Sequence, residues 1–476
     1  MDEIKLKKGM ELDLTIEGLA LGGKGFARKN NYMIFVDRAI PGQTVRVFLR
    51  KVKKNYAEAR VLEVMEDAKD AFPPRCSHFG ECGGCLLQNL DYKKQIQYKR
   101  AQVTETLQHI GGFTDLEAEP VLPSPDIYFY RNKMEYSFSR MRWLTKEEIE
   151  TNNIQANKDF ALGLHVPGRH DKVLDVESCY LLSEESNRIL RDVNDWARES
   201  GIAPYSTVDH SGYWRFLVLR RGVFTSEFMI NLVTAHDEKK HESVEQLKDF
   251  LISKYPGITT FVHNINKKKA QIAVGDEERI LHGKGFITEK LGDLIFHISA
   301  NSFFQTNSRQ TVHLYDKVLE IGDFSTQDIV YDLYSGTGSI AMYLSKKVNR
   351  IVGIELVQAA IRDAEKNCEL NEIENCTFIR GDLKDVIADS NALVSEYGAP
   401  DKVIIDPPRS GMHPSIPGAV MALKPERIVY VSCNPATFAR DAKELCDNDY
   451  SLQRVHPVDM FPHTPHIEVV ALLTRK

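Results

Sequence analysis

The sequence lacks any hydrophobic run long enough to cross a bilayer as a helix, and its charged first residues, MDEIKLKKGMELDL, lack the apolar stretch of a secretory signal. These absences predict a cytoplasmic protein with no membrane partner. An excess of positive charge is also missing. Because the net charge is −6, only local basic patches could hold a nucleic-acid partner.

Cysteine is scarce. Eight cysteines among 476 residues are too few for a disulfide framework in a chain of this length. In a reducing compartment, clustered cysteines indicate metal binding or catalysis instead. With 42% hydrophobic and 27% charged residues the chain should be globular, and its length predicts about two to four domains.

The pattern of apolar residues divides the chain into three parts. Residues 1–65 alternate polar and apolar side chains between glycine-rich turns, which predicts a small β-barrel. Residues 66–298 mix strands and helices and predict an α+β domain with an antiparallel sheet; within them, residues 91–110 predict an amphipathic helix with a basic face. Residues 299–476 alternate strand and helix, which predicts an α/β domain, a doubly wound Rossmann-like parallel sheet. In such sheets ligands bind at the carboxyl ends of the strands.

A basic stretch lies in the first part. Residues 38–57 carry six lysines and arginines and no acid. Lysines of this kind protect a solvated strand edge from aggregation, but they also suit a phosphate-binding face. We favour the phosphate-binding face because of the chemistry predicted further along the chain.

A glycine-rich loop follows a strand of the third part and opens a helix. This loop, DLYSGTGS at residues 332–339, allows a ligand to approach the backbone closely. Glu355 ends the next strand, about 20 residues on, where an acid can accept hydrogen bonds from ribose hydroxyls. The same spacing fits a dinucleotide site, so NAD is an alternative at this point. Asp382 ends a third strand, where it either contacts an adenine ring or caps a helix.

A thiol and two carboxylates follow at further strand ends. Cys433 lies in Val-Ser-Cys-Asn-Pro after an apolar strand, and Asp406 opens an Asp-Pro-Pro-Arg turn that its prolines stiffen. Glu468 precedes the last strand. A small buried core residue is the usual role of such a cysteine. A thiolate near a carboxylate instead suits covalent addition followed by proton abstraction.

Five segments resemble those of the RNA 5-methyluridine methyltransferases: FFQTN (303–307), DLYSGTGS (332–339), IIDPPRSG (404–411), VSCNPAT (431–437) and FPHTPHIEVV (461–470). The resemblance extends over essentially the whole chain. It outweighs the NAD alternative, because a dehydrogenase needs no cysteine at this strand end. It also disfavours an amino-group methyltransferase, which would carry an Asn-Pro-Pro-aromatic turn.

The resemblance implies an S-adenosylmethionine-dependent methyltransferase domain and a covalent mechanism. Cys433 would add to carbon 6 of a uridine, carbon 5 would then attack the methyl group, and Glu468 would remove the carbon-5 proton. The target base would have to leave its stack to reach the site. By the same resemblance the cofactor contacts would be Gln305, Tyr334, Glu355 and Asp406, with Asp382 and Ser339 as additional candidates.

Four other cysteines form a second group. Cys76, Cys82 and Cys85 follow a C-x5-C-G-G-C pattern, and Cys179 comes much later. Three close cysteines and a distant one suit either zinc or an iron–sulfur cluster, and the lack of a second C-x2-C pair disfavours zinc. The resemblance implies a [4Fe–4S] cluster held by all four.

The N-terminal part resembles a TRAM domain, an RNA-binding module. A TRAM domain together with the cluster implies the branch that modifies 23S rRNA, because the shorter tRNA members generally lack both. A tRNA 5-methyluridine methyltransferase and a non-catalytic RNA-binding iron–sulfur protein are the alternatives. Cys433 and Glu468 argue against a non-catalytic protein. We expect a monomer.

Overall fold

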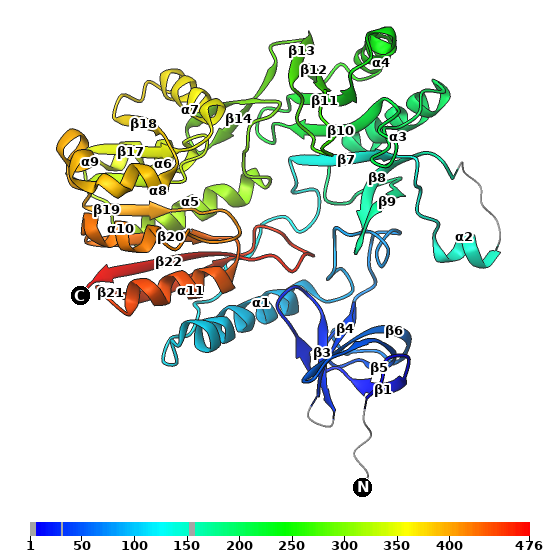
Figure 1. The fold of residues 1–476 in the computed structure, drawn as a ribbon, viewed down its shortest axis with the longest axis horizontal. Helices are drawn as coiled ribbons and strands as arrows, with labels where there is room; N and C mark the ends of the chain where they lie inside the picture. Colours follow the sequence, from blue (N-terminus) through cyan, green and yellow to red (C-terminus); the bar gives the residue numbers. More distant parts are fainter. Residues whose placement is uncertain (1–5, 30–31, 152–157) are drawn as a thin grey trace.

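The computed structural model describes residues 6–29, 32–151 and 158–476, which are arranged around three large sheets (Figure 1). The domain boundaries predicted after residues 65 and 298 stay predictions. Each lies one residue before the end of a strand, because β6 ends at Glu66 and β15 ends at Ser299. None of the helices in these described ranges has the length and apolar character needed to cross a membrane.

The N-terminal part is a six-stranded sheet in the order β1-β5-β6-β4-β3-β2, curled on itself (Figure 1). Its core arises from simple alternation: in β5, Val45, Val47 and Leu49 are buried while the residues between them face outward. The strands are β1 (Glu11–Thr15), β2 (Gly18–Leu19), β3 (Gly25–Lys29), β4 (Tyr32–Asp37), β5 (Thr44–Val52) and β6 (Tyr56–Glu66).

The predicted helix over residues 91–110 is present as α1 (Tyr92–Thr106), continued by a π-helical turn η1 (Leu107–Gly111). Asp91 caps its start by accepting a hydrogen bond from a backbone N–H of the first turn. The predicted amphipathic character is wrong, because the buried face is mostly polar. The buried polar residues of α1 are Gln95, Lys99, Gln102 and Thr106.

The central part is a seven-stranded sheet in the order β13-β12-β11-β10-β7-β8-β9. The predicted antiparallel pairing holds except between β11 and β12, which are parallel because helix α4 crosses over between them. The strands are β7 (Lys133–Ser139), β8 (Ala161–Val166), β9 (Arg169–Asp175), β10 (Trp214–Arg221), β11 (Phe228–Ala235), β12 (Ile258–Asn266) and β13 (Glu277–His282). The helices are α2 (Lys146–Thr151), α3 (Glu184–Glu199), η2 (Glu238–Lys240) and α4 (His241–Lys254). A hairpin of β14 (Phe286–Leu291) and β15 (Leu294–Ser299) follows.

The C-terminal part is a seven-stranded sheet in the order β18-β17-β16-β19-β20-β22-β21. Its strands are β16 (Ile329–Leu333), β17 (Arg350–Glu355), β18 (Cys376–Arg380), β19 (Lys402–Ile405), β20 (Arg427–Ser432), β21 (Tyr450–Val458) and β22 (Glu468–Arg475). Its helices are α5 (Ser308–Gly322), α6 (Ser339–Leu344), η3 (Ser345–Lys347), α7 (Gln358–Leu370), α8 (Leu383–Val386), η4 (Ile387–Asp389), α9 (Ser390–Tyr397), α10 (Ile416–Leu423) and α11 (Pro435–Cys446).

Five of these strands, β16 to β20, are parallel as predicted, but the fully parallel sheet is wrong at one edge. The last strand, β22, runs antiparallel to β20, and β21, a strand that the sequence pattern did not indicate, pairs antiparallel with β22. No helix separates β21 from β22 in the chain, so the second strand returns alongside the first in the opposite direction.

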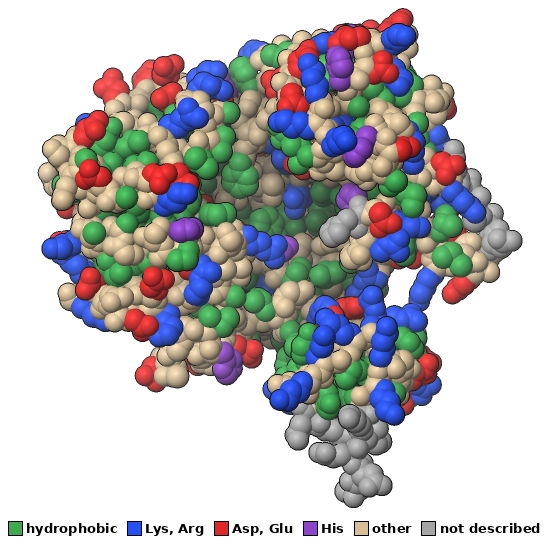
Figure 2. Space-filling view, viewed as in Figure 1, with side chains coloured by type: hydrophobic (Ala, Val, Ile, Leu, Met, Phe, Trp, Pro, Cys, Tyr) green, Lys and Arg blue, Asp and Glu red, His purple; other side chains and the backbone are tan. Residues whose placement is uncertain are grey.

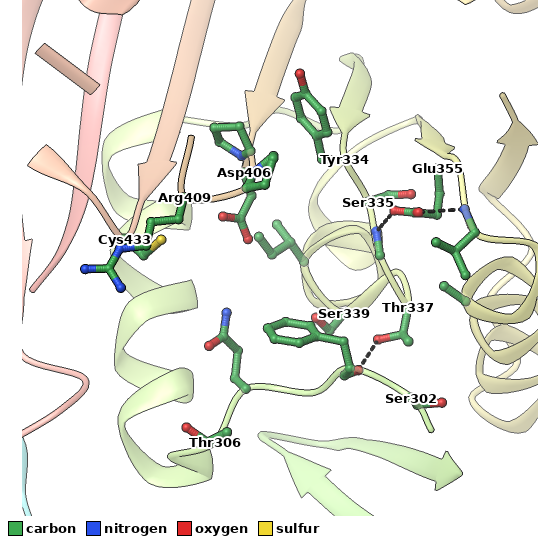
Figure 3. A pocket seen from close by; sticks show the side chains of 18 of the residues that line it. Ser302, Thr306, Tyr334, Ser335, Thr337, Ser339, Glu355, Asp406, Arg409 and Cys433 are labelled. Atoms are coloured by element: carbon green, nitrogen blue, oxygen red, sulfur yellow. Dashed lines mark hydrogen bonds between the residues drawn. The ribbon is translucent and has the colours of Figure 1, made fainter. Parts of the chain in front are cut away.

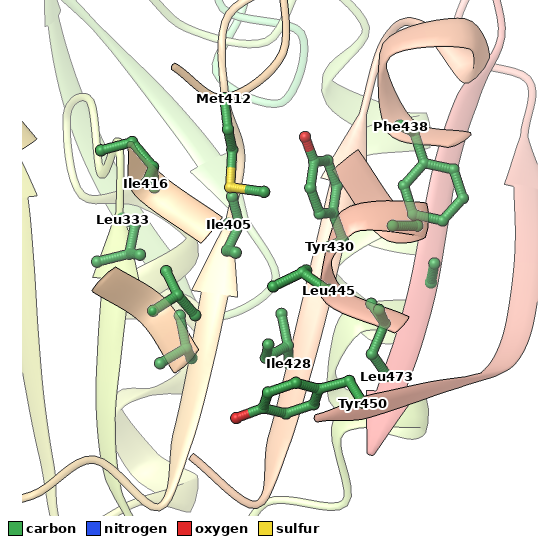
Figure 4. Close-up of a cluster of buried hydrophobic side chains, with 14 of the residues drawn as sticks. Leu333, Ile405, Met412, Ile416, Ile428, Tyr430, Phe438, Leu445, Tyr450 and Leu473 are labelled. Atoms are coloured by element: carbon green, nitrogen blue, oxygen red, sulfur yellow. The ribbon is translucent and has the colours of Figure 1, made fainter. Parts of the chain in front are cut away.

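One hydrophobic core packs between this sheet and the helices α10 and α11 (Figure 4). Ile428 and Tyr430 of β20 meet Phe438 and Leu445 of α11, and all four are fully buried. Close packing of this kind resists local distortion. It therefore holds the carboxyl ends of the strands, where the predicted site residues lie, in a defined arrangement.

Candidate active site

A cavity of about 800 Å³ opens at the carboxyl ends of β16, β17, β19 and β20 (Figure 3). Seven of the eight residues predicted for catalysis and cofactor binding line it. Asp382 is the one that does not. The seven are Gln305, Tyr334, Ser339, Glu355, Asp406, Cys433 and Glu468.

The glycine-rich loop is shaped by a glycine that no other residue could replace without strain. Gly338 has a φ of 71° at the start of α6, and a Cβ there would come within 2.6 Å of the Phe378 ring. Thr337 donates a hydrogen bond to the backbone oxygen of Phe303 at 3.4 Å (Figure 3). The loop is thereby tied to the segment that carries Gln305.

Glu355 is fixed by the backbone. Its carboxylate accepts hydrogen bonds from the N–H groups of Gly336 at 2.9 Å and Val357 at 2.8 Å (Figure 3). Each oxygen retains a free acceptor position, which suits two neighbouring ribose hydroxyls. Ser339, on the other side of the loop, shares a hydrogen bond of 2.7 Å with the Tyr315 hydroxyl.

Asp382 takes the other role foreseen for it. Its carboxylate caps α8 by accepting from the Lys384 N–H at 3.2 Å, and it forms an ion pair with the Lys384 side chain at 3.1 Å. The helix-cap alternative therefore describes its position, and its side chain lies outside the lining of the cavity.

Two buried carboxyls, of Asp332 and Glu468, and the partly buried Asp406 make this cavity suited to a cation. Burial raises the pKa of Asp406 to about 7, and burial together with the nearby Asp406 raises the pKa of Glu468 to about 8. Asp332 is 1% exposed. Burial and then Asp406 hold its pKa well above the usual range. A cationic ligand would relieve the cost of ionising all three.

Cys433 follows directly after β20 and is half-buried. Burial, and then the nearby carboxyls of Glu468 and Asp406, raise its pKa to about 11, while the Arg409 guanidinium acts in the opposite direction. The Asn434 side chain caps α11 and donates to the backbone oxygen of Arg409 at 3.0 Å. This bond joins the loop of Cys433 to the Asp-Pro-Pro-Arg turn, so the thiol and Asp406 are held side by side.

Glu468 reaches the site because β22 is antiparallel. Its register with β20 pairs Ser432 with Val469, so one further step in the same register places Cys433 opposite Glu468. Because β22 runs opposite to β20, the first residue of β22 lies at the sheet edge where β19 and β20 end. The thiol and the carboxylate thus meet at one end of the sheet.

Several lining residues were missed by the sequence analysis. Arg409 and His466 lie inside motifs that were recognised, so the signal was present but received no role. Asp332 likewise opens the glycine-rich loop. Arg131 comes from the chain before β7, and nothing in the sequence connected it with the cavity.

The four predicted metal ligands line a second cavity, of about 320 Å³. Cys76, Cys82, Cys85 and Cys179 all face it, and burial raises the pKa of each thiol, to about 12 for Cys82 and Cys85. Four soft sulfur donors around one cavity fit an iron–sulfur cluster by their chemistry. Within the described ranges, however, no three His, Cys, Asp or Glu side chains are placed so that they could hold a metal ion. The cluster is therefore not established.

The two cavities are neighbours. Arg131, Thr464 and His466 line both of them. Burial, and then the Arg409 cation, lower the pKa of His466 to about 4, so its ring is neutral at physiological pH. Residues 459–467, which connect β21 to β22, thus lie between the cysteines and the active-site cavity.

The predicted basic face of the N-terminal part is smaller than the sequence indicates. Acids from neighbouring strands neutralise part of it: Arg46 pairs with Asp13, and Lys51 pairs with Glu58. Arg50 pairs in the same way with an acid of β4. Lys53 and Lys54 are exposed, and neither forms an ion pair with a described acid. Figure 2 shows Lys and Arg side chains on the barrel, on the side that faces the hollow at the centre of the view.

Comparison with known proteins identifies the family. The tRNA (uracil-5-)-methyltransferase family matches residues 236–476, and the TRAM domain matches residues 5–62. The chain belongs to the tRNA (uracil-5-)-methyltransferase family. An uncharacterized RNA methyltransferase of Chlorobaculum tepidum is 44% identical over 99% of this chain and 98% of its own. Another from Bacteroides thetaiotaomicron is 39% identical over 96% of this chain and 99% of its own.

A solved structure resembles nearly the whole chain. The tRNA (uracil-54, C5)-methyltransferase of Pyrococcus abyssi, in complex with S-adenosyl-L-homocysteine, superposes with a TM-score of 0.75. It is 31% identical and covers 97% of this chain and 99% of its own. Members of this family are S-adenosylmethionine-dependent RNA methyltransferases, so the NAD alternative is excluded and the predicted methyltransferase fold with an N-terminal TRAM domain is confirmed.

Proposed function

We propose that this chain transfers a methyl group to carbon 5 of a uridine in 23S rRNA through a covalent bond between Cys433 and carbon 6. The register of β20 and β22, which places Cys433 opposite Glu468, is the observation that carries the proposal. A nucleophile and a base on the same side of one cavity are what such a reaction needs.

The proposed reaction divides into addition, methylation and elimination. The Cys433 thiolate forms a bond to carbon 6, and the electron pair of the 5,6 double bond moves toward carbon 5 and the carbon-4 oxygen. Carbon 5 accepts the methyl group that bound S-adenosylmethionine would supply, with cleavage of the S–CH3 bond and S-adenosyl-L-homocysteine as the leaving group. Glu468 then takes the carbon-5 proton, the 5,6 double bond re-forms, and the C6–S bond breaks to release Cys433 as a thiolate.

The cofactor contacts proposed are those predicted residues that line the cavity. Glu355 would accept from ribose hydroxyls, and Asp406, with Asp332 beside it, would face the positive charge of the cofactor. Asp382 is left out because its carboxylate caps α8. The other contacts would be Gln305, Tyr334 and Ser339.

The choice of 23S rRNA depends on the TRAM domain and the four converging cysteines. A tRNA substrate is the second candidate, because the Pyrococcus abyssi enzyme, which acts on a tRNA uracil, matches this chain over almost its whole length. Chain length therefore does not separate the two substrates. With either RNA, the exposed Lys53 and Lys54 would contact phosphates. We also propose a cytoplasmic monomer.

The substrate and the reaction can be tested together. Transcripts of 23S rRNA and of tRNA, each labelled with tritium at carbon 5 of uridine, are incubated with the purified protein and S-adenosylmethionine. We expect 5-methyluridine and an equal amount of released tritium from the 23S transcript, because methylation must break the C5–H bond. The same products from tRNA alone would transfer the proposal to tRNA. Methylated RNA without tritium release would refute the reaction at carbon 5.

We further propose that Cys76, Cys82, Cys85 and Cys179 hold a [4Fe–4S] cluster. The position of four partly buried cysteines around one cavity supports it, because a metal cluster would bind them as thiolates and so offset the burial that raises their pKa. Since the methyl transfer moves no unpaired electrons, the cluster would have a structural role.

Metal analysis tests the cluster. Protein purified without oxygen should be brown and contain about four iron atoms per chain, as a four-thiolate cubane requires. Cys85→Ser should lose most of this iron, whereas the control Cys446→Ser, on α11, should retain it. Stoichiometric zinc, or iron that both variants retain equally, would contradict the assignment.

A further inference from the structure

The buried face of α1 is mostly polar, and Val103 is its one fully buried apolar residue. Tyr92, Gln95, Lys99, Gln102 and Thr106 recur at intervals of three and four residues, which places them on one side of the helix. Lys99 and Gln95 are both 0% exposed. Burying a polar group costs free energy unless it forms a hydrogen bond or ion pair. The partners of these side chains therefore show which segments α1 holds in place.

Lys99 and Tyr92 hold the start of residues 459–467. The Lys99 ammonium forms an ion pair with Asp459 at 2.7 Å and donates to the backbone oxygen of Phe461 at 3.2 Å. The Tyr92 hydroxyl donates to the other carboxylate oxygen of Asp459 at 3.0 Å. Lys99 and Asp459 both lie in the protein interior, where such charge-assisted bonds are strong.

Gln95 joins the middle of this segment to the cysteine-bearing loop. Its side-chain oxygen accepts from the His463 N–H at 3.0 Å, and its amide nitrogen donates to the backbone oxygens of Leu87 and Leu90, both at 2.8 Å. The backbone oxygen of His463 in turn accepts from the N–H groups of Leu86, at 2.9 Å, and Leu87, at 3.0 Å. The chain just after Cys85 is thereby bonded to the chain just before His466.

Gln102 joins α1 to the barrel. Its amide donates to the backbone oxygens of Leu19, at 2.8 Å, and Ala20, at 3.1 Å. Figure 1 shows α1 lying between the barrel and the C-terminal part. Residues 459–467, the loop after Cys85 and the barrel turn at Leu19 and Ala20 are far apart in the sequence, and all three form hydrogen bonds with α1.

We propose that α1 positions residues 459–467, and with them Glu468 and His466, so that Gln95 and Lys99 are positioning residues for the proton-removal step. Residues 459–467 connect β21 to β22 without a helix or strand of their own, and Thr464 and His466 among them line both cavities. Their conformation is set by bonds to α1 and to the loop after Cys85. The expected effect on turnover rests on the proposed role of Glu468 as the base. The expected effect on the conformation of residues 459–467 does not.

Two matched substitutions on α1 separate positioning from general stability. Gln95→Leu and Gln102→Leu make the same change on the same buried face, but only Gln95 bonds to His463. Hydrogen exchange of the full-length protein should become about tenfold faster at residues 459–467 in Gln95→Leu, the size expected when buried hydrogen bonds are lost. Gln102→Leu should leave that segment unchanged and speed exchange near residue 20.

The kinetic arm uses RNA and S-adenosylmethionine. Gln95→Leu should lower kcat with an unchanged KM for S-adenosylmethionine and should raise the fraction of protein bonded covalently to RNA, because proton removal becomes slow. Gln102→Leu should do neither. If Gln95→Leu does not fold, Tyr92→Phe, which removes the hydroxyl that donates to Asp459 and accepts from the Ser124 N–H, should give the same effects in weaker form.

The outcomes distinguish the two proposals. Equal exchange at residues 459–467 in both glutamine variants would overturn the positioning role of α1, whatever the kinetics. Faster exchange in Gln95→Leu with wild-type kcat would show that the segment does not position a reacting group, and would overturn the role of Gln95 in proton removal. Normal turnover by Glu468→Gln would instead overturn the assigned base, and the exchange measurements would still decide how the segment is held.

Discussion

Replacing Cys433 with alanine is expected to lower methyl transfer by about a thousandfold or more, since it is the only cysteine among the described residues that line the cavity. Without that bond carbon 5 stays a poor nucleophile. Tritium release from carbon-5-labelled uridine should fall by the same factor, because it depends on the same addition.

Binding should survive this change. Cys433 is only half-buried, and the residues proposed to contact the cofactor come from other loops, so the affinity for S-adenosylmethionine should be close to that of the unchanged protein. Calorimetry measures it directly. Cys446→Ala, a thiol of the same domain outside the cavity, is the matched control and should remain active. An alanine variant at Cys433 that turns over normally would refute the covalent mechanism.

Replacing Glu468 with glutamine is expected to allow one methyl transfer and then stop. The amide cannot take the carbon-5 proton, so the thiol is not eliminated and the protein remains bonded to RNA. A denaturing gel should show a protein–RNA band of reduced mobility in near-stoichiometric amount, with multiple turnover reduced about a hundredfold or more. The band should be absent in the double variant that also carries Cys433→Ala.

The same residue predicts a pH dependence. Because burial and Asp406 raise the pKa of Glu468 to about 8, its basic form increases as the pH rises and makes up half of the population at that value. The elimination step should therefore accelerate about fivefold from pH 7 to pH 8 and level off at higher pH. A rate of elimination that does not change over this range, or a glutamine variant that forms no adduct and remains fully active, would place the base elsewhere.

Much of this site follows from the sequence alone because parallel strands all end at one edge of their sheet. A polar motif directly after each apolar strand is therefore brought to a common place by local structure. Glu355, Asp406 and Cys433 were predicted in this way. Gln305 and Tyr334 were predicted from the family resemblance, and all five line one cavity. The motif at Asp382 also ends a strand, but its carboxylate caps the next helix. The sequence pattern left open whether this carboxylate would contact the cofactor or cap the helix.

The tertiary structure decided what depends on pairing between distant segments. The direction of β22 places Glu468 opposite Cys433, and a pattern of apolar residues does not encode strand direction. The sequence of β5 and its flanks contains no acid and therefore predicted a strongly basic face. In the structure, Asp13 and Glu58 on neighbouring strands form ion pairs with Arg46 and Lys51. Composition along one strand carries no information about the strand beside it.

The polar face of α1 shows the same limit most clearly. The helix itself was predicted correctly, because a helical period is a local property of the backbone, but the predicted amphipathic pattern was wrong. That Gln95 and Lys99 are buried depends on Asp459 and His463, more than three hundred residues further along the chain. A helix period can be predicted from neighbouring residues, whereas the partner that makes burial of a lysine possible exists only once the chain has folded.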